Sequence, residues 1–200
     1  MESLVIQPSA TAQWHALVGE AEQACATRLG EELESYLVFL LMRYTDLPEI
    51  ANSVLALDYL HSMEAVGHLR ETQLREVGDK CLLYSGLFPA RAERRRVNSS
   101  YYVKLGMGAY AALATALAQL KAKLFEDLSQ QFVKLMDVLQ TMRELGNGKP
   151  CLQPLQAMEL WTETGSAHAL QNLAQYTNAS PVQIALISSS TLPKNKTYAH

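Results

Sequence analysis

The chain is poor in cysteine. Its three cysteines, Cys25, Cys81 and Cys151, are odd in number and widely spaced, and no two of them form a CxxC pair. Disulfide frameworks and cysteine-based zinc sites need paired or regularly spaced cysteines. The sequence therefore predicts reduced thiols, with neither a disulfide framework nor a zinc site.

Long apolar runs are also missing. The longest fully apolar stretch covers residues 36–42, far below the roughly 20 residues that a membrane-spanning helix needs. Residues 1–8 show no cationic segment followed by an apolar run of the secretory type. We therefore expect a cytoplasmic protein without a membrane partner.

A strong net charge is absent as well. The formal net charge is −3, which gives no general attraction to nucleic acid, and nucleic-acid binding is not expected. One local basic cluster joins two predicted helices, and we interpret it as a solvated connector, with a protein-docking patch as the alternative. Its members are Arg91, Arg94, Arg95 and Arg96.

Signatures of catalysis are lacking too. There is no GxSxG motif, and the glycine-rich segment 146–150 has Pro150 where a phosphate loop needs Ser or Thr. His15 and His168 lie among apolar or small residues, which is typical of packing or surface histidines. The sequence predicts no cofactor. It leaves enzymatic activity open and favours a non-enzymatic role.

Helical periodicity is what the chain does contain. Apolar residues recur at steps of three and four in most of the sequence, and turn or stop signals separate the segments. We predict an all-α, single-domain multi-helix bundle of about seven to eight helices over residues 1–177, followed by an extended or poorly ordered tail at 178–200. The expected helices lie near residues 14–25, 33–44, 48–60, 62–88, 101–119, 124–145, 153–163 and 166–176.

A stripe of possible metal ligands lies in the segment 61–79. At the steps expected for one face of a single helix, it presents the possible ligands His61, Glu64, His68 and Glu71, followed by Arg75 and Asp79. A di-iron bundle needs carboxylates from four helices, and one helix cannot supply them. We interpret the stripe as a solvated face stabilised by ion pairs, with a metal site as the alternative.

Asp79 stands out because its neighbours along the predicted helix are apolar. A buried acid needs hydrogen-bond partners, and we expect a tyrosine or an arginine near the helix 101–119 to donate to it. The sequence predicts a polar clasp that fixes helix register, with a ligand pocket as the alternative. The residues of this clasp or pocket are Asp79, Tyr84, Tyr101, Tyr102 and Tyr110.

The segment 75–110 also resembles a family of uncharacterised bacterial helical proteins. The likeness lies in the R-E-x-G-D pattern at 75–79, the Gly-x-Phe at 86–88, the tyrosine pair 101–102 and the Gly-x-x-x-Tyr at 106–110. It covers roughly residues 68–145. It implies a bacterial, cytosolic, all-helical protein and transfers no activity and no catalytic residue.

Two hypotheses about function follow. The first is a non-enzymatic protein that acts through protein–protein contacts, with a protein partner or itself as a homodimer, because apolar helix surface is abundant and no catalytic grouping is found. The second is a bundle that binds a small apolar ligand or a metal, and that could be an enzyme.

Overall fold

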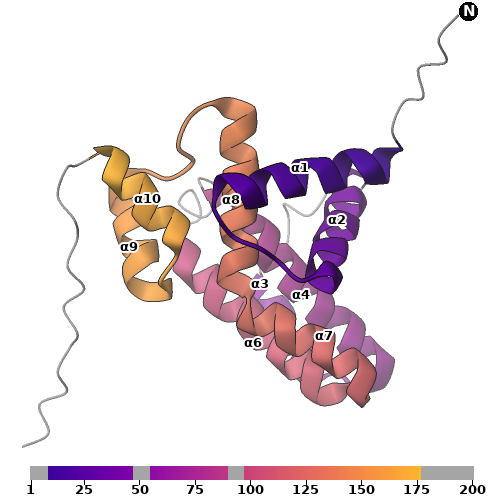
Figure 1. Ribbon diagram of the computed structural model, residues 1–200. Coiled ribbons are helices and arrows are strands. Elements are labelled where there is room, and N and C mark those ends of the chain that lie inside the picture. The colour runs from indigo at the N-terminus through magenta and orange to yellow at the C-terminus, as the bar shows by residue number, and fades with distance from the viewer. Residues whose placement is uncertain (1–8, 47–54, 90–96, 177–200) are drawn as a thin grey trace, which may run out of the picture.

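The computed structural model describes residues 9–46, 55–89 and 97–176, which form nine helices and no strand. The predicted all-α, single-domain bundle is confirmed. The helices, labelled as in Figure 1, are α1 (Ala10–Ala24), α2 (Glu31–Asp46), α3 (Leu55–Glu64), α4 (Gly67–Leu87), α6 (Ser99–Ala116), α7 (Gln119–Gln130), α8 (Phe132–Asn147), α9 (Pro154–Thr164) and α10 (Ala167–Tyr176).

Two helices make up the centre of the bundle. Both α4 and α8 carry long runs of buried residues, at positions 81–86 and 135–141 respectively. They meet where Gly86 lies against the Leu139 side chain, so closely that a Cβ at Gly86 would come within 2.6 Å of it. Gln140 and Arg143 on α8 donate hydrogen bonds to the carbonyls of Ser85 and Leu87 at the end of α4. These two hydrogen bonds join the end of α4 to α8.

The first two helices lie against one side of this centre. Figure 1 shows the C-terminal end of α1 lying across α8, with α2 beside α1. Ser9 caps α1 by accepting a hydrogen bond from the amide of Ala12.

The apolar run 36–42 predicts a helix in the middle of the bundle, and this prediction is wrong in part. Leu37 and Leu41 are buried, but Phe39 is 60% exposed, because the outer face of α2 has no helix over it among the described residues.

The segment 55–87 forms two helices, as the sequence predicts, but the break between them is not at the predicted position near residue 61. The actual break lies at residues 65–66, and α4 starts at Gly67, whose φ of +58° is a backbone conformation that favours glycine. The break changes which faces are buried. Leu57, Leu60 and Leu69, expected on inner faces, are all more than half exposed.

The segment 99–147 forms three helices. A two-residue extended link at Leu117 and Ala118 separates α6 from α7, close to the break predicted near 119–124. The single helix predicted over 124–145 is wrong, because the chain changes direction at Gln131, between α7 and α8 (Figure 1). No glycine or proline marks this second break, so tertiary packing places it.

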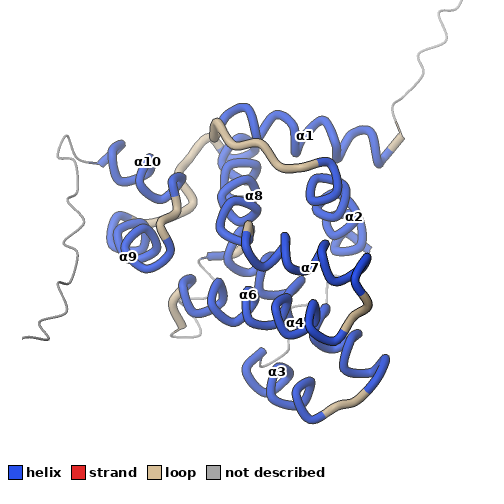
Figure 2. Tube along the Cα trace, turned by 60° about the horizontal axis from the view of Figure 1, so that its bottom comes forward, coloured by secondary structure: helices blue, strands red, loops and turns tan. Residues whose placement is uncertain are grey.

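The final two helices form the predicted hairpin. The turn at 146–150 ends α8, with Gly148 in the left-handed conformation at φ +63°. Gly165 plays the same role between α9 and α10. The hairpin lies at one side of the molecule and α3 at its edge (Figure 2).

Three predictions fall outside the described residues. They are the helix-start signal at 46–49, of which only Asp46 is described, as the last residue of α2, the arginine cluster 91–96, and the tail 178–200.

Candidate functional site

Asp79 lies on α4 in the interior and is 5% exposed. Its Oδ1 accepts hydrogen bonds from the hydroxyl groups of Tyr36 on α2, at 2.5 Å, and Tyr110 on α6, at 2.8 Å. The contact expected between Asp79 and a tyrosine of the helix 101–119 is therefore present. The carboxylate joins three helices.

Two arginines complete what we call the Asp79 cluster, formed by Tyr36, Arg43, Arg75, Asp79 and Tyr110. Arg43 and Arg75 lie 3.5 and 3.7 Å from Asp79 Oδ2, which is beyond hydrogen-bond distance, so charge alone links them to that oxygen. Arg75 also donates to the Tyr36 hydroxyl at 3.3 Å and stands over the Tyr36 ring.

Burial controls the protonation of the Asp79 cluster. It raises the pKa of Asp79, while the hydrogen bonds from Tyr36 and Tyr110 and the charges of Arg75 and Arg43 oppose part of this rise. Burial also raises the pKa of both tyrosines well above their ordinary value. The tyrosines therefore remain hydrogen-bond donors.

Gly78 explains how Tyr110 reaches Asp79. A Cβ at position 78 would lie 2.4 Å from the Tyr110 ring, so only glycine lets this ring pass over α4. Gly106 on α6 has the same role, since a Cβ there would lie 2.5 Å from Phe132 and 2.8 Å from Cys81. Glycines on α4 and α6 therefore allow the close approach of Tyr110 and Phe132.

The other predicted tyrosines lie elsewhere along α4 and α6. Tyr84 and Tyr102 are buried and stack on each other with ring centroids 5.5 Å apart. Tyr101 is exposed and makes an edge contact with Tyr102. Sequence reasoning missed Tyr36 and Arg43 as members of the Asp79 cluster, because they lie on α2 and no local signal connects them to Asp79.

The predicted metal stripe does not form a single face. His61 and Glu64 lie on α3, whereas His68 and Glu71 lie on α4, so the prediction of one helix is wrong. His68 and Glu71 pair with each other at 3.5 Å. Within the described ranges, these four residues do not form a group with metal-ligand spacing.

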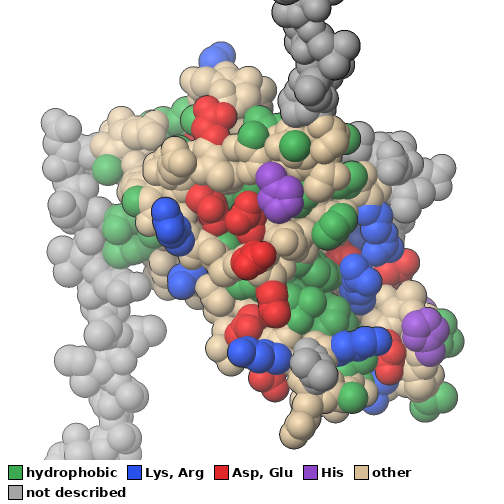
Figure 3. All heavy atoms as spheres, turned by 45° about the vertical axis from the view of Figure 1, so that its right-hand side comes forward, with side chains coloured by type: hydrophobic (Ala, Val, Ile, Leu, Met, Phe, Trp, Pro, Cys, Tyr) green, Lys and Arg blue, Asp and Glu red, His purple; other side chains and the backbone are tan. Residues whose placement is uncertain are grey.

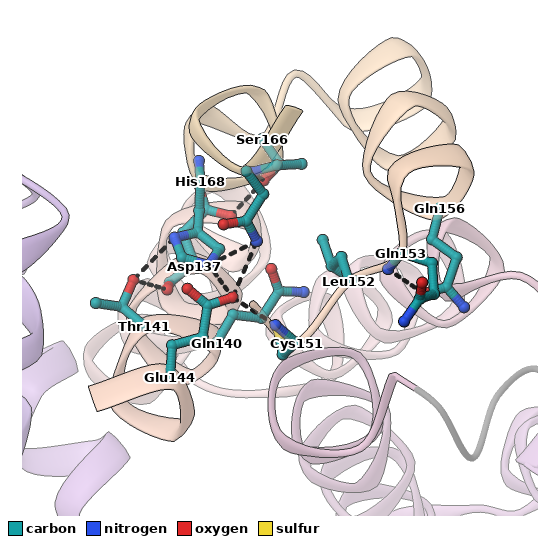
Figure 4. Close-up of polar contacts among 12 residues, drawn as sticks. Asp137, Gln140, Thr141, Glu144, Cys151, Leu152, Gln153, Gln156, Ser166 and His168 are labelled. Carbon is teal, nitrogen blue, oxygen red and sulfur yellow. Dashed lines mark hydrogen bonds and ion pairs between the residues drawn. The ribbon is translucent and has the colours of Figure 1, made fainter. Parts of the chain in front are cut away.

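A second polar cluster, which sequence reasoning did not predict, lies where the end of α8 meets α10. We call it the Glu144 cluster. Figure 4 shows Thr141 and Glu144 of α8 facing His168 of α10, with Cys151 of the intervening loop beside them. It consists of Thr141, Glu144, Cys151, His168 and Asn172.

Glu144 is the centre of this cluster. Its Oε1 accepts hydrogen bonds from the Cys151 amide at 2.7 Å and from the Asn172 side chain at 2.9 Å, and His168 Nε2 lies 3.1 Å from it. Burial alone raises the pKa of Glu144, but the contacts with His168, the Cys151 amide and Asn172 outweigh it and lower that pKa to about 2. Glu144 is therefore a carboxylate at neutral pH.

The hydrogen bond at the other ring nitrogen, Nδ1, indicates that this nitrogen of His168 carries a proton. Thr141 Oγ1 donates its only proton to the carbonyl of Asp137 at 2.8 Å, so it accepts from His168 Nδ1 at 3.0 Å. With Nδ1 protonated, Nε2 faces Glu144 and the Asn172 amide: it donates to Glu144 in the imidazolium form and presents a lone pair in the neutral form.

A buried acid anchors α10 and hence His168. Asp137 on α8 accepts hydrogen bonds from the Ser166 hydroxyl at 2.6 Å and from the amides of Ala167 and His168 at 3.1 and 3.3 Å. Ser166 in turn accepts from the Ala169 amide, as an N-cap residue does. Burial raises the pKa of Asp137 against these hydrogen bonds.

The Cys151 thiol lies close to Glu144 and is half-buried. Burial, reinforced by the Glu144 charge, raises the pKa of this thiol. A nucleophilic cysteine needs a lowered pKa, so the arrangement does not make Cys151 a nucleophile. A pocket of about 390 Å³ adjoins the cluster, and its walls include Thr141, Glu144, His168 and Asn172.

A shallow groove passes over the Asp79 cluster, between α2, α4 and α7. It measures about 800 Å³, and Tyr36 and Arg75 connect its floor to Asp79. Figure 3, which faces the side that includes α2, shows apolar side chains among acidic and basic ones. The groove is lined by two acids and two bases, so its charge favours neither anions nor cations. Its lining residues are Glu31, Glu32, Ser35, Tyr36, Phe39, Arg75, Lys121, Leu124 and Phe125.

Apolar side chains are also exposed where α3 meets α4. Five of them, 42% to 81% exposed, lie within thirteen consecutive residues. Both signs of charge flank them, on His61, Glu64, Arg70 and Glu71. We call this feature the α3–α4 surface, and its apolar members are Leu57, Leu60, Met63, Val66 and Leu69.

Comparisons with protein-family models, curated proteins and solved structures found no match for this chain. The family resemblance expected from residues 75–110 therefore stays a prediction. No helix in the described part of the chain is both long and apolar enough to cross a bilayer.

Proposed function

We propose that this is a non-enzymatic protein of the bacterial cytoplasm that acts through protein–protein contacts, and that its partner is a second copy of the same chain. The α3–α4 surface is the observation that carries the proposal. It is an apolar area of two neighbouring helices that the described part of the chain leaves open to water.

The concentration of these side chains favours a contact surface. Single exposed leucines are common on soluble proteins, but clustered large apolar residues are typical of interaction sites. Leu57, Leu60 and Met63 are spaced by three residues on α3, and Val66 and Leu69 extend the surface into the first turn of α4. Covering them removes apolar area from water, which favours association and opposes the loss of translational and rotational freedom on binding.

The charges around the surface support a second copy as the partner. Two-fold symmetry places the same surface of each copy face to face. The rim of the α3–α4 surface carries His61 and Arg70 beside Glu64 and Glu71, so basic groups of one copy can oppose acidic groups of the other. Electrostatic complementarity of this kind favours one orientation and one partner.

Light scattering coupled to size-exclusion chromatography tests the proposal. We expect the wild-type protein to be a dimer at micromolar concentration and Leu60→Glu to be a monomer with an unchanged helical circular-dichroism spectrum. Leu155→Glu is the matched control, because Leu155 is 78% exposed on α9, a helix that lies apart from α3 (Figure 2). That variant should remain a dimer.

Two results would overturn the proposal. One is a wild-type protein that stays monomeric at high micromolar concentration. The other is a dimer that Leu155→Glu dissociates and Leu60→Glu does not, since the contact would then lie on the α9 side.

A further inference from the structure

The sequence-based alternative of a metal-binding bundle placed the ligands at residues 61–71. The structure brings a different set together. Among the described residues, Glu144, Cys151 and His168 are the one group of His, Cys, Asp or Glu side chains whose ligand atoms all lie within 4.8 Å of one another. They come from three separate parts of the chain, namely α8, the loop after it and α10.

We propose that Glu144, Cys151 and His168 form a binding site for a divalent transition metal of the zinc class. Carboxylate oxygen, thiolate sulfur and imidazole nitrogen are the donors that Zn²⁺ takes in proteins. A thiolate disfavours Mg²⁺ and Ca²⁺, which prefer sets of oxygen ligands. Around zinc, such ligands stand roughly 3.3–3.8 Å apart, so small side-chain movements bring the present spacing of up to 4.8 Å into this range.

The hydrogen bonds of His168 match those of a metal ligand. Ligating histidines donate the second ring N–H to a neighbouring oxygen, which fixes their orientation. Here Nδ1–H donates to Thr141, whose own proton goes to the Asp137 carbonyl. Nε2 faces the Glu144 carboxylate at 3.1 Å. A bound divalent cation takes the place of the proton that an imidazolium Nε2 donates to this carboxylate, because a metal ligand must be deprotonated.

Asn172 and the pocket provide a further indication. The Asn172 side-chain oxygen is buried and has no hydrogen-bond partner within the described residues. Asn172, Glu144 and His168 all line the pocket of about 390 Å³. Three protein ligands next to a pocket leave a fourth position for water or a small ligand, and the Asn172 oxygen can accept a hydrogen bond from a water bound there.

Metal binding at this site requires the thiolate form of Cys151. The S–H bond breaks, its proton passes to solvent, and the sulfur electron pair forms the bond to the metal, with no change in oxidation state. The site differs from the α3–α4 surface, so its test is independent of the dimer.

The experiment is a titration of the purified, chelator-stripped full chain with Co²⁺ as the spectroscopic probe. We expect one Co²⁺ per chain, with thiolate-to-cobalt charge transfer in the near ultraviolet and the intense visible bands of a four-coordinate ion. Zn²⁺ should displace the cobalt. Cys151→Ser should abolish the charge-transfer band and weaken Zn²⁺ binding by about a hundredfold, and Thr141→Val should weaken it by about tenfold.

The matched control is Cys25→Ser, which removes a thiol outside the cluster and should leave the cobalt spectrum unchanged. Circular dichroism of each variant reports whether the helices are intact. The proposal is overturned if the wild type shows no thiolate band, or if folded Cys151→Ser keeps the band. Loss of the band in Cys25→Ser alone would also overturn it.

Discussion

The Asp79 cluster and the Glu144 cluster each place a carboxylate among several donors, yet they differ in access. Asp79 is 5% exposed and joins α2, α4 and α6 in the core. The Glu144 side chain is 16% exposed and stands in the wall of a pocket. The Asp79 carboxylate is covered by its partners, and only Tyr36 and Arg75 of its cluster border a groove, whereas Glu144 itself lines its pocket.

The surroundings of the two clusters explain the difference. Tyr36 and Tyr110 donate to Asp79 in the core, and Tyr110 passes closely over Gly78, so these hydrogen bonds serve packing and register. Glu144 lies near the end of α8, where the chain turns through Gly148 and the neighbouring backbone belongs to a loop. Similar side chains therefore have different uses, depending on whether helices or a loop surround them.

The largest expected effect comes from disrupting the Asp79 cluster. Gly78→Ala places a Cβ 2.4 Å from the Tyr110 ring, which forces the ring away from Asp79. We expect the free energy of unfolding to fall by about 3 kcal/mol, from overpacking together with the lost hydrogen bond. Urea denaturation measures it.

The control for this substitution is Gly19→Ala in α1. A Cβ at position 19 meets no atom within 4 Å, so alanine should raise the free energy of unfolding by about 0.5–1 kcal/mol through its helix propensity. Similar changes in the two variants would contradict the close-packing argument.

Removing the acid itself should have the next largest effect. Asp79→Ala leaves the hydroxyls of Tyr36 and Tyr110 without their acceptor, and we expect a loss of about 1–3 kcal/mol in urea denaturation. Glu71→Ala, which removes a partly exposed partner of His68, should change stability by about 0.5 kcal/mol or less. Equal, small losses at both positions would show that the Asp79 cluster does not stabilise the fold.

A smaller effect is expected where Ser166 caps α10. Ser166→Ala removes the acceptor for the Ala169 amide and a donor to Asp137, and should cost about 1 kcal/mol of unfolding free energy. Thr162→Ala on the exposed side of α9 is the control and should stay within about 0.5 kcal/mol of wild type. If thermal or urea unfolding does not separate the two variants, the cap is not stabilising.

The pH dependence of stability should show the smallest effect. Because the pKa of Asp79 is raised in the fold, folding favours its protonated form. The stability of wild type relative to Asp79→Asn should therefore fall as pH rises from about 4, the unfolded pKa, through the folded pKa. The groups facing Asp79 are Tyr36 and Arg43 of α2, Arg75 of α4 and Tyr110 of α6.

Urea denaturation of both proteins between about pH 4 and pH 8 checks this dependence. Parallel stability curves would mean that Arg43 and Arg75 compensate fully for the burial of the charge. A relative stability that rises with pH would show that they do more than compensate, and the direction given for the Asp79 pKa would be wrong.

The helices, the buried state of Asp79 and its partners Arg75 and Tyr110 could be predicted from the sequence, whereas its two partners on α2 could not. An acid among apolar neighbours on a long helix signals burial and a need for donors. The donor Tyr110 was within the predicted set because its helix follows α4 directly. Tyr36 is 43 residues away, and only the packing of α2 against α4 brings it to Asp79.

The Glu144 cluster shows the same limit more strongly. Glu144, Cys151 and His168 have no motif spacing, and the turn at 146–150 predicts only that a helix ends there. Their meeting depends on how the α9–α10 hairpin folds back onto α8, held by Asp137 and Ser166. No local signal encodes that contact.

The sequence by itself determined the all-helical class, most helix ends and the positions of the glycines and the buried acid, because periodicity, capping and turn chemistry act over a few neighbouring residues. Only the tertiary structure decided the break at Gln131, the exposure of the α3–α4 surface and the membership of both polar clusters. These features depend on which helices pack together, and packing joins residues far apart in the chain through contacts that a linear pattern does not record.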